Sequence, residues 1–287
     1  MTAARQPYSL VFPDGRTLLL GGRTCVMGIL NVTPDSFADG GLRFQPDAAM
    51  AAAVEMARAG ADLIDIGGES TRPGADPLPA DEEWRRVGPV LEGLRGRIGV
   101  PLSIDTSKAV IADRALALGA AMVNDVSALT LDPEMAGVVA RHGVPVVLMH
   151  ARGRSRDMYA HAQYRDVVGE VTSELADRVR AAEAAGIASS QIVVDPGLGF
   201  AKRAEQSLAV LAGLDRLAAL GRPILVGPSR KSFLRAALGD VPAEQRVWGT
   251  AAAVTAAVLG GAHIVRVHDV ALMVQVVRVA DAVRAAQ

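Results

Sequence analysis

Polar side chains that can do chemistry follow almost every short apolar run of this sequence. The run at 102–104 leads to Asp105, and the run at 192–194 leads to Asp195. A single Asp or Asn after a strand commonly caps the next helix. Eight consecutive runs with such ends favour a shared site, because the parallel strands of a barrel bring their carboxyl ends to one rim. These residues are Asn31, Asp65, Asp105, Asn124, His150, Asp195, Lys231, Arg266 and His268.

The mixture of groups indicates two kinds of ligand and argues against a tightly held metal. Hydrogen-bond acceptors and an amide suit a flat heterocycle with several N–H groups, and Asp105, Asn124 and Asp195 offer them. Cations suit a phosphate or diphosphate, and the candidates are Arg72, Arg266 and His268. No cluster of His, Cys or Glu has the spacing of a structural zinc site. We therefore expect any metal to be a Mg²⁺ ion that arrives with a phosphate ligand.

Two loops are long and rich in turn-forming residues. Segments 32–41 and 67–79 follow the first two apolar runs and contain several Gly and Pro residues. Such a length is uncommon for a connection between a strand and a helix. We expect both segments to act as lids that close over a substrate and exclude water. Phe37, one of only five Phe residues, lies on the first segment and is expected to cover the ligand.

The elements that must position these side chains alternate regularly. Short apolar runs alternate with helical stretches whose apolar residues are three and four positions apart, which predicts a (β/α)8 TIM barrel. The alternation at 8–20 around Pro13-Asp14-Gly15 predicts a β-hairpin that plugs the amino-terminal end of the barrel. An open doubly wound sheet is the alternative, but no Gly-rich dinucleotide fingerprint follows an early strand. The predicted strands are 24–31, 62–66, 101–104, 121–124, 144–149, 192–194, 224–226 and 263–267, and the predicted helices are 46–58, 80–97, 107–117, 133–141, 164–185, 204–219, 243–259 and 270–286.

Length and composition predict one domain over 1–287, with the hairpin extension at 1–22 and the barrel at 23–287. Half of the residues are apolar, and the formal net charge of −1 gives no broad attraction to nucleic acid or to an anionic membrane. The single cysteine, Cys25, lies in an apolar run and is expected to be a buried, inert thiol. The first ten residues contain no apolar stretch of signal-peptide length, so we expect a cytoplasmic protein.

Eight of these segments, taken in order, resemble the dihydropteroate synthase family. The resemblance runs from about residue 24 to the last predicted helix, and eight motifs in register are far more specific than one. Ala201 departs from the pattern, because the family often has Gly there, and the loop at 151–156 is more basic than usual. The matching segments are NVTPDSF at 31–37, DIGGESTRPG at 65–74, SIDT at 103–106, VND at 123–125, MH at 149–150, DPGLGF at 195–200, SRKS at 229–232 and RVHD at 266–269.

The resemblance implies a transferase of a family that sulfonamides target, which condenses 7,8-dihydropterin-6-ylmethyl diphosphate with 4-aminobenzoate, aided by Mg²⁺. It implies catalytic roles for Asp105, Lys231 and Arg266, and a contact of Asn31 with the metal. It places the pterin ring on Asp105, Asn124, Met149, Asp195, Gly227, Lys231 and Arg266. The diphosphate would be held by Asn31, Arg72, Arg266 and His268, and the aminobenzoate by Phe37, Thr71, Arg72, Pro73, Phe200, Lys231 and Ser232.

Other functions remain open at this point. A pterin-dependent methyltransferase barrel would share the pterin acceptors but would not need the cations Arg72, Arg266 and His268. A barrel aldolase would use Lys231 as a Schiff-base former, but Lys231 lies beyond its apolar run. A non-catalytic pterin-binding protein would leave the two lid segments without a role. The family resemblance also implies a homodimer formed through the carboxyl-terminal helices, and the basic loop at 151–156 could tune diphosphate capture.

Overall fold

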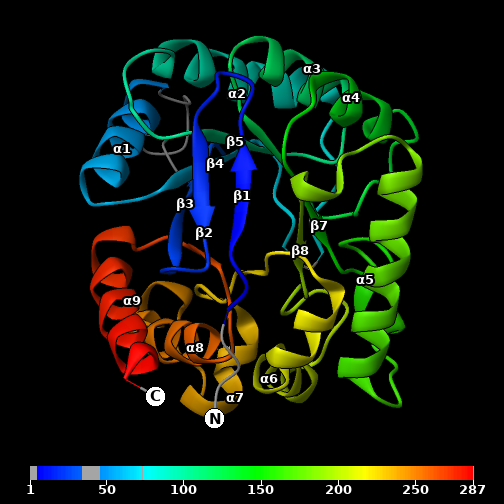
Figure 1. Ribbon diagram of the computed structural model, residues 1–287, viewed down its shortest axis with the longest axis vertical. Helices are drawn as coiled ribbons and strands as arrows, with labels where there is room; N and C mark the ends of the chain where they lie inside the picture. Colours follow the sequence, from blue (N-terminus) through cyan, green and yellow to red (C-terminus); the bar gives the residue numbers. More distant parts are fainter. Residues whose placement is uncertain (1–4, 34–45, 73, 287) are drawn as a thin grey trace.

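The computed structural model describes residues 5–33, 46–72 and 74–286, and it confirms the predicted barrel (Figure 1). Eight strands form one sheet in the order β8-β7-β6-β5-β4-β3-β10-β9, and every paired neighbour is parallel. A bridge between Val194 and Ile224 joins the two ends of this sheet and closes the ring. The strands are β3 (Cys25–Asn31), β4 (Leu63–Gly67), β5 (Leu102–Asp105), β6 (Met122–Asp125), β7 (Val146–Met149), β8 (Ile192–Asp195), β9 (Leu225–Val226) and β10 (Ile264–Val267).

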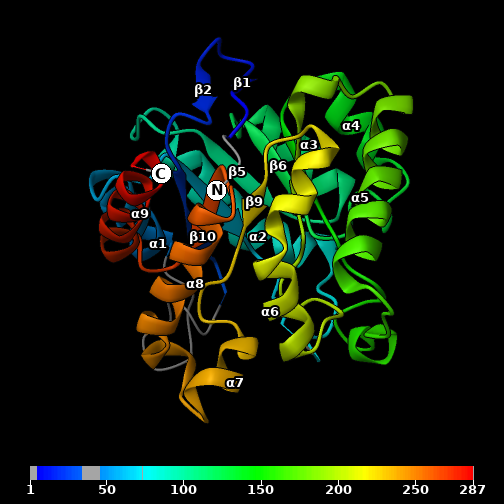
Figure 2. The same cartoon turned by 60° about the horizontal axis from the view of Figure 1, so that its bottom comes forward.

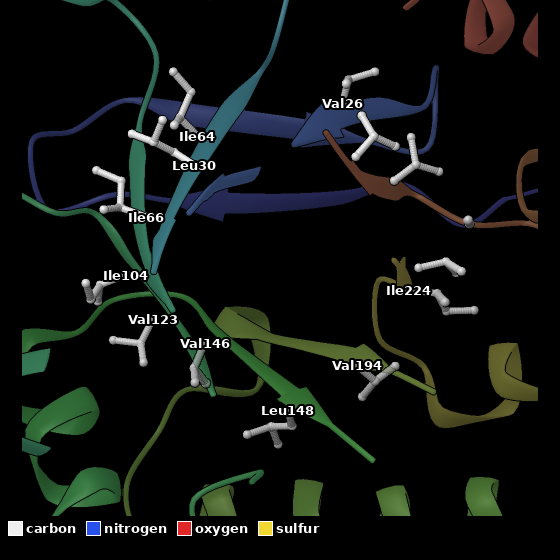
Figure 3. Packing of buried hydrophobic residues seen from close by; sticks show 14 of the residues in the cluster. Val26, Leu30, Ile64, Ile66, Ile104, Val123, Val146, Leu148, Val194 and Ile224 are labelled. Atoms are coloured by element: carbon white, nitrogen blue, oxygen red, sulfur yellow. The ribbon is translucent and has the colours of Figure 1, made fainter. Parts of the chain in front are cut away.

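Alternate residues of each strand face outward and form the larger hydrophobic core with the surrounding helices. Figure 3 shows aliphatic side chains of this layer, among them Val26, Ile64 and Val146. Val, Ile and Leu dominate because both faces of a parallel sheet are buried. The helices around the sheet are α1 (Pro46–Arg58), α2 (Ala80–Leu94), α3 (Ala109–Ala117), α4 (Met135–His142), α5 (Val167–Ala184), α6 (Ala204–Ala212), α8 (Val247–Leu259) and α9 (Val270–Ala285), with the short α7 (Arg235–Leu238) before α8.

The inward-facing residues near the strand starts form a second core with the amino-terminal hairpin. Strands β1 (Tyr8–Val11) and β2 (Thr17–Leu20) pair in antiparallel fashion, and Figure 2 shows this hairpin at one end of the molecule. Its buried side chains Leu10, Phe12 and Leu20 belong to one cluster with inward residues of seven barrel strands. The predicted plug is therefore confirmed, and Cys25 is buried in the same cluster, as expected.

The elements differ from the predictions mainly at their ends. The predicted helix 204–219 is interrupted at Gly213, where α6 stops and the 3₁₀ helix η3 (Leu214–Leu220) begins. A Cβ atom at Gly213 would lie 3.1 Å from both Cγ atoms of Val168, so close packing on α5 favours a glycine here. Helix α5 starts later than predicted because the Asp166 side chain accepts a hydrogen bond from Gly169 N and caps it.

Short 3₁₀ helices lie on the connections between the main elements. Besides η3 they are η1 (Met158–His161), η2 (Ser189–Gln191), η4 (Ser232–Leu234) and η5 (Ala243–Gln245).

No helix in the described ranges combines the length and apolar character that crossing a membrane requires.

Candidate active site at the barrel mouth

The strand ends that carry the predicted polar residues stand next to one another in register. Asp105 of β5 is paired with Asn124 of β6, and Met149 of β7 is paired with Asp195 of β8. Gly67 of β4 is paired with Asp105 on one side. Because side chains alternate between the two faces of a strand, these positions continue the inward-facing series above the apolar core. The common rim predicted from the sequence is confirmed.

Arg266 is the centre of a buried ionic network that joins four strands. Its Nε donates to Asp65 Oδ2 at 2.6 Å, and its terminal nitrogen donates to Asp105 Oδ2 at 2.7 Å. Asn124 Nδ2 also donates to Asp65 Oδ2, at 2.8 Å. Residues 201 positions apart in the sequence thus meet at one point. The arrangement fixes the planes of the guanidinium, the amide and two carboxylates around the barrel mouth.

Asp65 is the site residue that the sequence analysis noted at a run end but gave no role. Its side chain is fully buried, and its Oδ1 has no hydrogen-bond partner among the described residues. A buried acceptor without a partner costs free energy unless a ligand supplies a donor. The alternation of side chains along β4 could have indicated a role for Asp65. Ile66 packs outward, so Asp65 and Gly67 on either side of it both face inward.

Burial shifts the pKa of Asp105, which belongs to this network, and of Asp195 and Lys231. Burial raises the pKa of Asp105 to about 7, although the nearby Arg266 acts to lower it. Burial also raises the pKa of Asp195, against the effect of the Lys231 ammonium. The same desolvation lowers the pKa of Lys231 to about 8, and Asp195 opposes that shift. Pairs such as Asp105 and Lys231, whose pKa values lie near neutral pH, are typical of an active site.

Lys231 and Phe200 contact each other beside the network. The Lys231 Nζ donates to Leu198 O at 2.6 Å and lies 4.6 Å from the centre of the Phe200 ring. A Cβ at Gly227 would lie 3.7 Å from Arg266 Cβ and 4.0 Å from Lys231 Nζ. Gly227 therefore lies within van der Waals reach of both cations.

The predicted diphosphate residues gather at the β10 end of the mouth. The His268 ring Nδ1 and the His268 backbone N lie 3.0 and 3.2 Å from Ser229 Oγ. Burial, with Arg230, Arg266 and Arg72 nearby, lowers the pKa of His268 to about 3. His268 is therefore neutral at pH 7, in contrast to the expectation of a cation. If Ser229 Oγ donates to Nδ1, the Nε2 atom keeps a proton for an anionic ligand.

For several other predicted site residues, the structure gives the position and the burial but does not test the predicted role. Asn31, at the end of β3, is half-buried and is paired with Gly67. Thr71 is half-buried, and Ser232 is exposed at the start of η4. Arg72 is exposed on segment 67–79, whose predicted role as a lid stays a prediction. Phe37 and Pro73 lie outside the described residues, so their predicted roles at the aminobenzoate stay predictions. Within the described ranges, no group of three or more His, Cys, Asp or Glu could hold a metal ion.

Comparison with known proteins agrees with this geometry. A family model described as pterin binding enzyme matches residues 27–268. The chain is 48% identical to the dihydropteroate synthase of Synechocystis sp. over 271 residues, which cover 94% of both chains. It is 46% identical to the Bacillus subtilis dihydropteroate synthase, covering 91% of this chain and 88% of that one.

Solved structures give the same relationship. The Xanthomonas albilineans dihydropteroate synthase with 4-aminobenzoic acid is 47% identical, with a TM-score of 0.90 and coverage of 98% of this chain and 99% of that one. The Yersinia pestis enzyme in a sulfonamide drug complex is 42% identical, with a TM-score of 0.90 and coverage of 97% and 100%. The chain therefore belongs to the pterin-binding enzymes. Within that class it is a member of the dihydropteroate synthase family.

Proposed function

We propose that this chain condenses 7,8-dihydropterin-6-ylmethyl diphosphate with 4-aminobenzoate, giving 7,8-dihydropteroate and diphosphate, through a largely dissociative substitution. The observation that carries the mechanism is the buried network in which Arg266 contacts both Asp65 and Asp105. It supplies acceptors for the N–H edge of a pterin and negative charge where a cation would develop. The relatives named as dihydropteroate synthases, one of them solved with 7,8-dihydropteroate, support the reaction.

The residues divide the chemical work according to their place in the mouth. Asp105, Asn124 and Asp195 hold the pterin ring, while Lys231 donates to it and Arg266 stacks across its face. As the bond from the methylene carbon to oxygen breaks, its electron pair leaves with the diphosphate. The positive charge left on the pterin is stabilised by the nearby Asp105 carboxylate.

The aminobenzoate nitrogen then attacks the methylene carbon, and its proton passes to solvent. A weak aromatic amine needs a good leaving group more than it needs a base, so no side chain forms a covalent bond with substrate. Phe200, Lys231 and Ser232 would shape the pocket for the amine. We propose that sulfonamides compete with 4-aminobenzoate for this pocket, as the sulfonamide complex of the Yersinia pestis relative suggests.

The donor set fits a Mg²⁺ ion that is held mainly by the diphosphate. Asn31 would supply one amide oxygen from the end of β3, and Mg²⁺ commonly takes one or two protein oxygens together with phosphate and water. The bound ion would neutralise developing charge on the leaving diphosphate. His268 would donate from Nε2 to the diphosphate on the same side of the mouth.

We also propose a homodimer formed through α8 and α9. Helix α9 carries exposed apolar residues at Leu272, Val279 and Val283, which lie on one helical stripe because they are seven and four positions apart. Trp248, at the start of α8, is 79% exposed. Such a surface is typical of a protein–protein contact. The cytoplasmic location expected from the sequence stays a prediction.

The decisive experiment mixes the purified chain with the pterin diphosphate, 4-aminobenzoate and Mg²⁺. We expect diphosphate and dihydropteroate to form in equal amounts and to depend on all three additions. Pterin binding without diphosphate release, in a protein that circular dichroism shows to be folded, would indicate a non-catalytic pterin-binding protein and refute the proposed function.

A further inference from the structure

Lys202 is a buried lysine behind the active site that the mechanism does not use. Its side chain is among the largest fully buried groups of the protein, with 1% of its surface exposed. Its Nζ lies 2.8 Å from His150 Nδ1, 3.0 Å from Phe200 O and 3.1 Å from Gly197 O, with His150 O farther away at 3.4 Å. The three nearer atoms all lie within 3.1 Å. These three acceptor atoms are called the ammonium cage below. No carboxylate forms a salt bridge with this lysine in the described part of the chain.

The cage matches the ammonium form of lysine. The two carbonyl groups can only accept hydrogen bonds. His150 Nε2 lies 3.0 Å from Glu174 Oε2, and hydrogen bonding to His150 lowers the pKa of Glu174 to about 2, so Glu174 is a carboxylate and Nε2 carries the proton. His150 Nδ1 is then an acceptor as well. Three acceptors around one nitrogen require three N–H donors, which only the protonated amine has.

His150 links the Lys202 ammonium to the carboxylate of Glu174. The carboxylate of Glu174 accepts from the ring of His150, whose other nitrogen faces Lys202, so the positive and negative charges stand at opposite ends of one imidazole. Burial lowers the pKa of Lys202 to about 7, while the carboxylate of Asp195 acts to raise it. Arg152 of the basic loop donates to Glu174 at 3.1 Å and so completes this network.

The ammonium cage includes the backbone of the loop that connects β8 to α6. Positive φ angles recur in this loop, at Gly197 (66°), Gly199 (79°) and Ala201 (49°). A residue other than Gly rarely adopts such an angle without support. Lys202 contacts the carbonyl groups of residues 197 and 200, Lys231 contacts that of residue 198, and Tyr164 donates to that of residue 201. Side-chain donors thus hold four carbonyl groups of one short loop.

Two consequences follow for substrates. Phe200, on this loop, faces the Lys231 ammonium, so its ring position depends on the carbonyl group that Lys202 binds. Asp195 accepts a hydrogen bond of 2.7 Å from Gly197 N at the other end of the loop. The pterin has further contacts on β5, β6 and β10, whereas the Phe200 wall of the aminobenzoate pocket comes from this loop alone.

We propose that Lys202 is a positioning residue for aminobenzoate binding: its ammonium acts as a tethered cation in the cage of His150, Gly197 and Phe200 and fixes the Phe200 wall. The inference rests on the proposed function, because it assigns the Phe200 wall to the aminobenzoate. It differs from a catalytic role, since the Lys202 Nζ lies behind the loop and bonds to its backbone.

The first test compares Lys202→Ala and Lys202→Met below pH 7. In both variants we expect the KM for 4-aminobenzoate to rise about tenfold or more, because a hydrogen bond to a charged group is lost. The dissociation constant of the pterin diphosphate should change by less than about threefold. Unchanged KM values in folded variants would refute the inference. Wild-type turnover measured in parallel separates this failure from failure of the proposed function.

The second test separates a tethered cation from a structural side chain. Lys202→Ala removes a propylammonium group, so added propylammonium should restore the low KM, whereas 1-propanol of the same length should not. Lys202→Met fills the space and should resist rescue. Leu91→Ala, a truncation of a buried leucine on α2, serves as the control for a general effect of the salt on stability. Equal rescue by 1-propanol, or no rescue of folded Lys202→Ala, would contradict the inference.

A third measurement uses the unmodified protein, in case both variants fail to fold. The sequence has only three lysines, Lys108, Lys202 and Lys231. Lys108 pairs with Glu69 and Glu83, and Lys231 donates to Leu198 O, so these two lysines can also be protected. After labelling of lysine with nitrogen-15, we expect a slowly exchanging ammonium resonance below pH 7 that Glu174→Gln makes less protected, while the resonances of Lys108 and Lys231 stay unchanged. If Glu174→Gln changes none of the protected lysine resonances, the cage does not hold a cation and the inference is wrong.

Discussion

At the scale of single residues, one carboxylate organises the barrel mouth. Asp65 Oδ2 accepts from both Arg266 and Asn124, so it orients the two donors that flank the pterin position. Asp105 accepts from the other side of the same guanidinium. Removing one partner from a buried ion pair is costly because the remaining charge loses its compensation. The network is therefore sensitive at each of its members.

Asp65→Asn should lower kcat/KM by about a hundredfold or more, which corresponds to about 3 kcal/mol. The amide keeps the shape but removes the negative charge that holds Arg266 and adds an N–H group toward it. Steady-state kinetics with varied pterin diphosphate measures the effect. Asp166→Asn, which removes the carboxylate of an exposed pair with Arg216, is the control and should keep normal kinetics.

Asp105→Asn and Arg266→Ala should each abolish detectable turnover while the fold stays intact. Asp105 loses the charge that stabilises the developing cation, and Arg266→Ala leaves two buried carboxylates without their cation. Product formation and far-UV circular dichroism together test this. Near-normal turnover in either variant would show that the residue is not part of the reacting centre.

Acid should destabilise the protein between about pH 6.5 and pH 4. Burial lowers the pKa of His150 and of His263 to about 4, so over this range the unfolded chain binds protons that the folded chain does not. The stability is fully present above pH 6.5 and falls as the pH falls toward 4. Calorimetric Tm values should therefore decline, and less steeply in His263→Gln. The exposed His161→Gln should leave the slope unchanged.

At the scale of elements, the amino-terminal hairpin supplies part of the barrel core. Leu10, Phe12 and Leu20 fill the end of the barrel opposite to the mouth, where the inward strand residues are apolar. A barrel needs such filling because its interior is a packed core and not a channel. The hairpin therefore contributes to stability and lies away from the reacting groups.

Phe12→Ala should lower the free energy of unfolding by about 3–5 kcal/mol, because it leaves a cavity under the barrel. The KM values should stay near those of the wild type. Val11→Ala is a matched control at the neighbouring position, the last residue of β1, since Val11 is 50% exposed. Urea denaturation of the two variants makes the comparison, and equal losses would mean that the hairpin does not plug the barrel.

At the scale of the whole molecule, the proposed dimer makes a separate prediction. Sedimentation should give twice the mass of one 29.8 kDa chain. Val279→Glu should shift the protein to the monomer, because it places a charge in the exposed apolar stripe of α9. Val110→Glu on α3 is the control, as Val110 is also exposed but lies on another helix. A wild-type monomer at micromolar concentration would contradict the proposed dimer.

The sequence by itself determined the fold class and most of the rim. Apolar runs that alternate with helical periodicity require parallel strands covered by helices, and that topology alone brings Asp105, Asp195 and Arg266 to one mouth. Local chemistry was sufficient there, because each of these residues lies at or next to the carboxyl end of its own strand. The sequence pattern did not predict that α6 ends at Gly213, because that end depends on packing against Val168 of α5.

Only the tertiary structure decided how the polar groups combine. The contact between Asp65 and Arg266 joins positions 201 residues apart, and the contact between Lys202 and His150 joins positions 52 apart. The sequence shows the residue types but not which donor reaches which acceptor. Burial, which moves the pKa of Asp105 to about 7 and makes His268 neutral at pH 7, likewise depends on neighbours that come from other strands and loops.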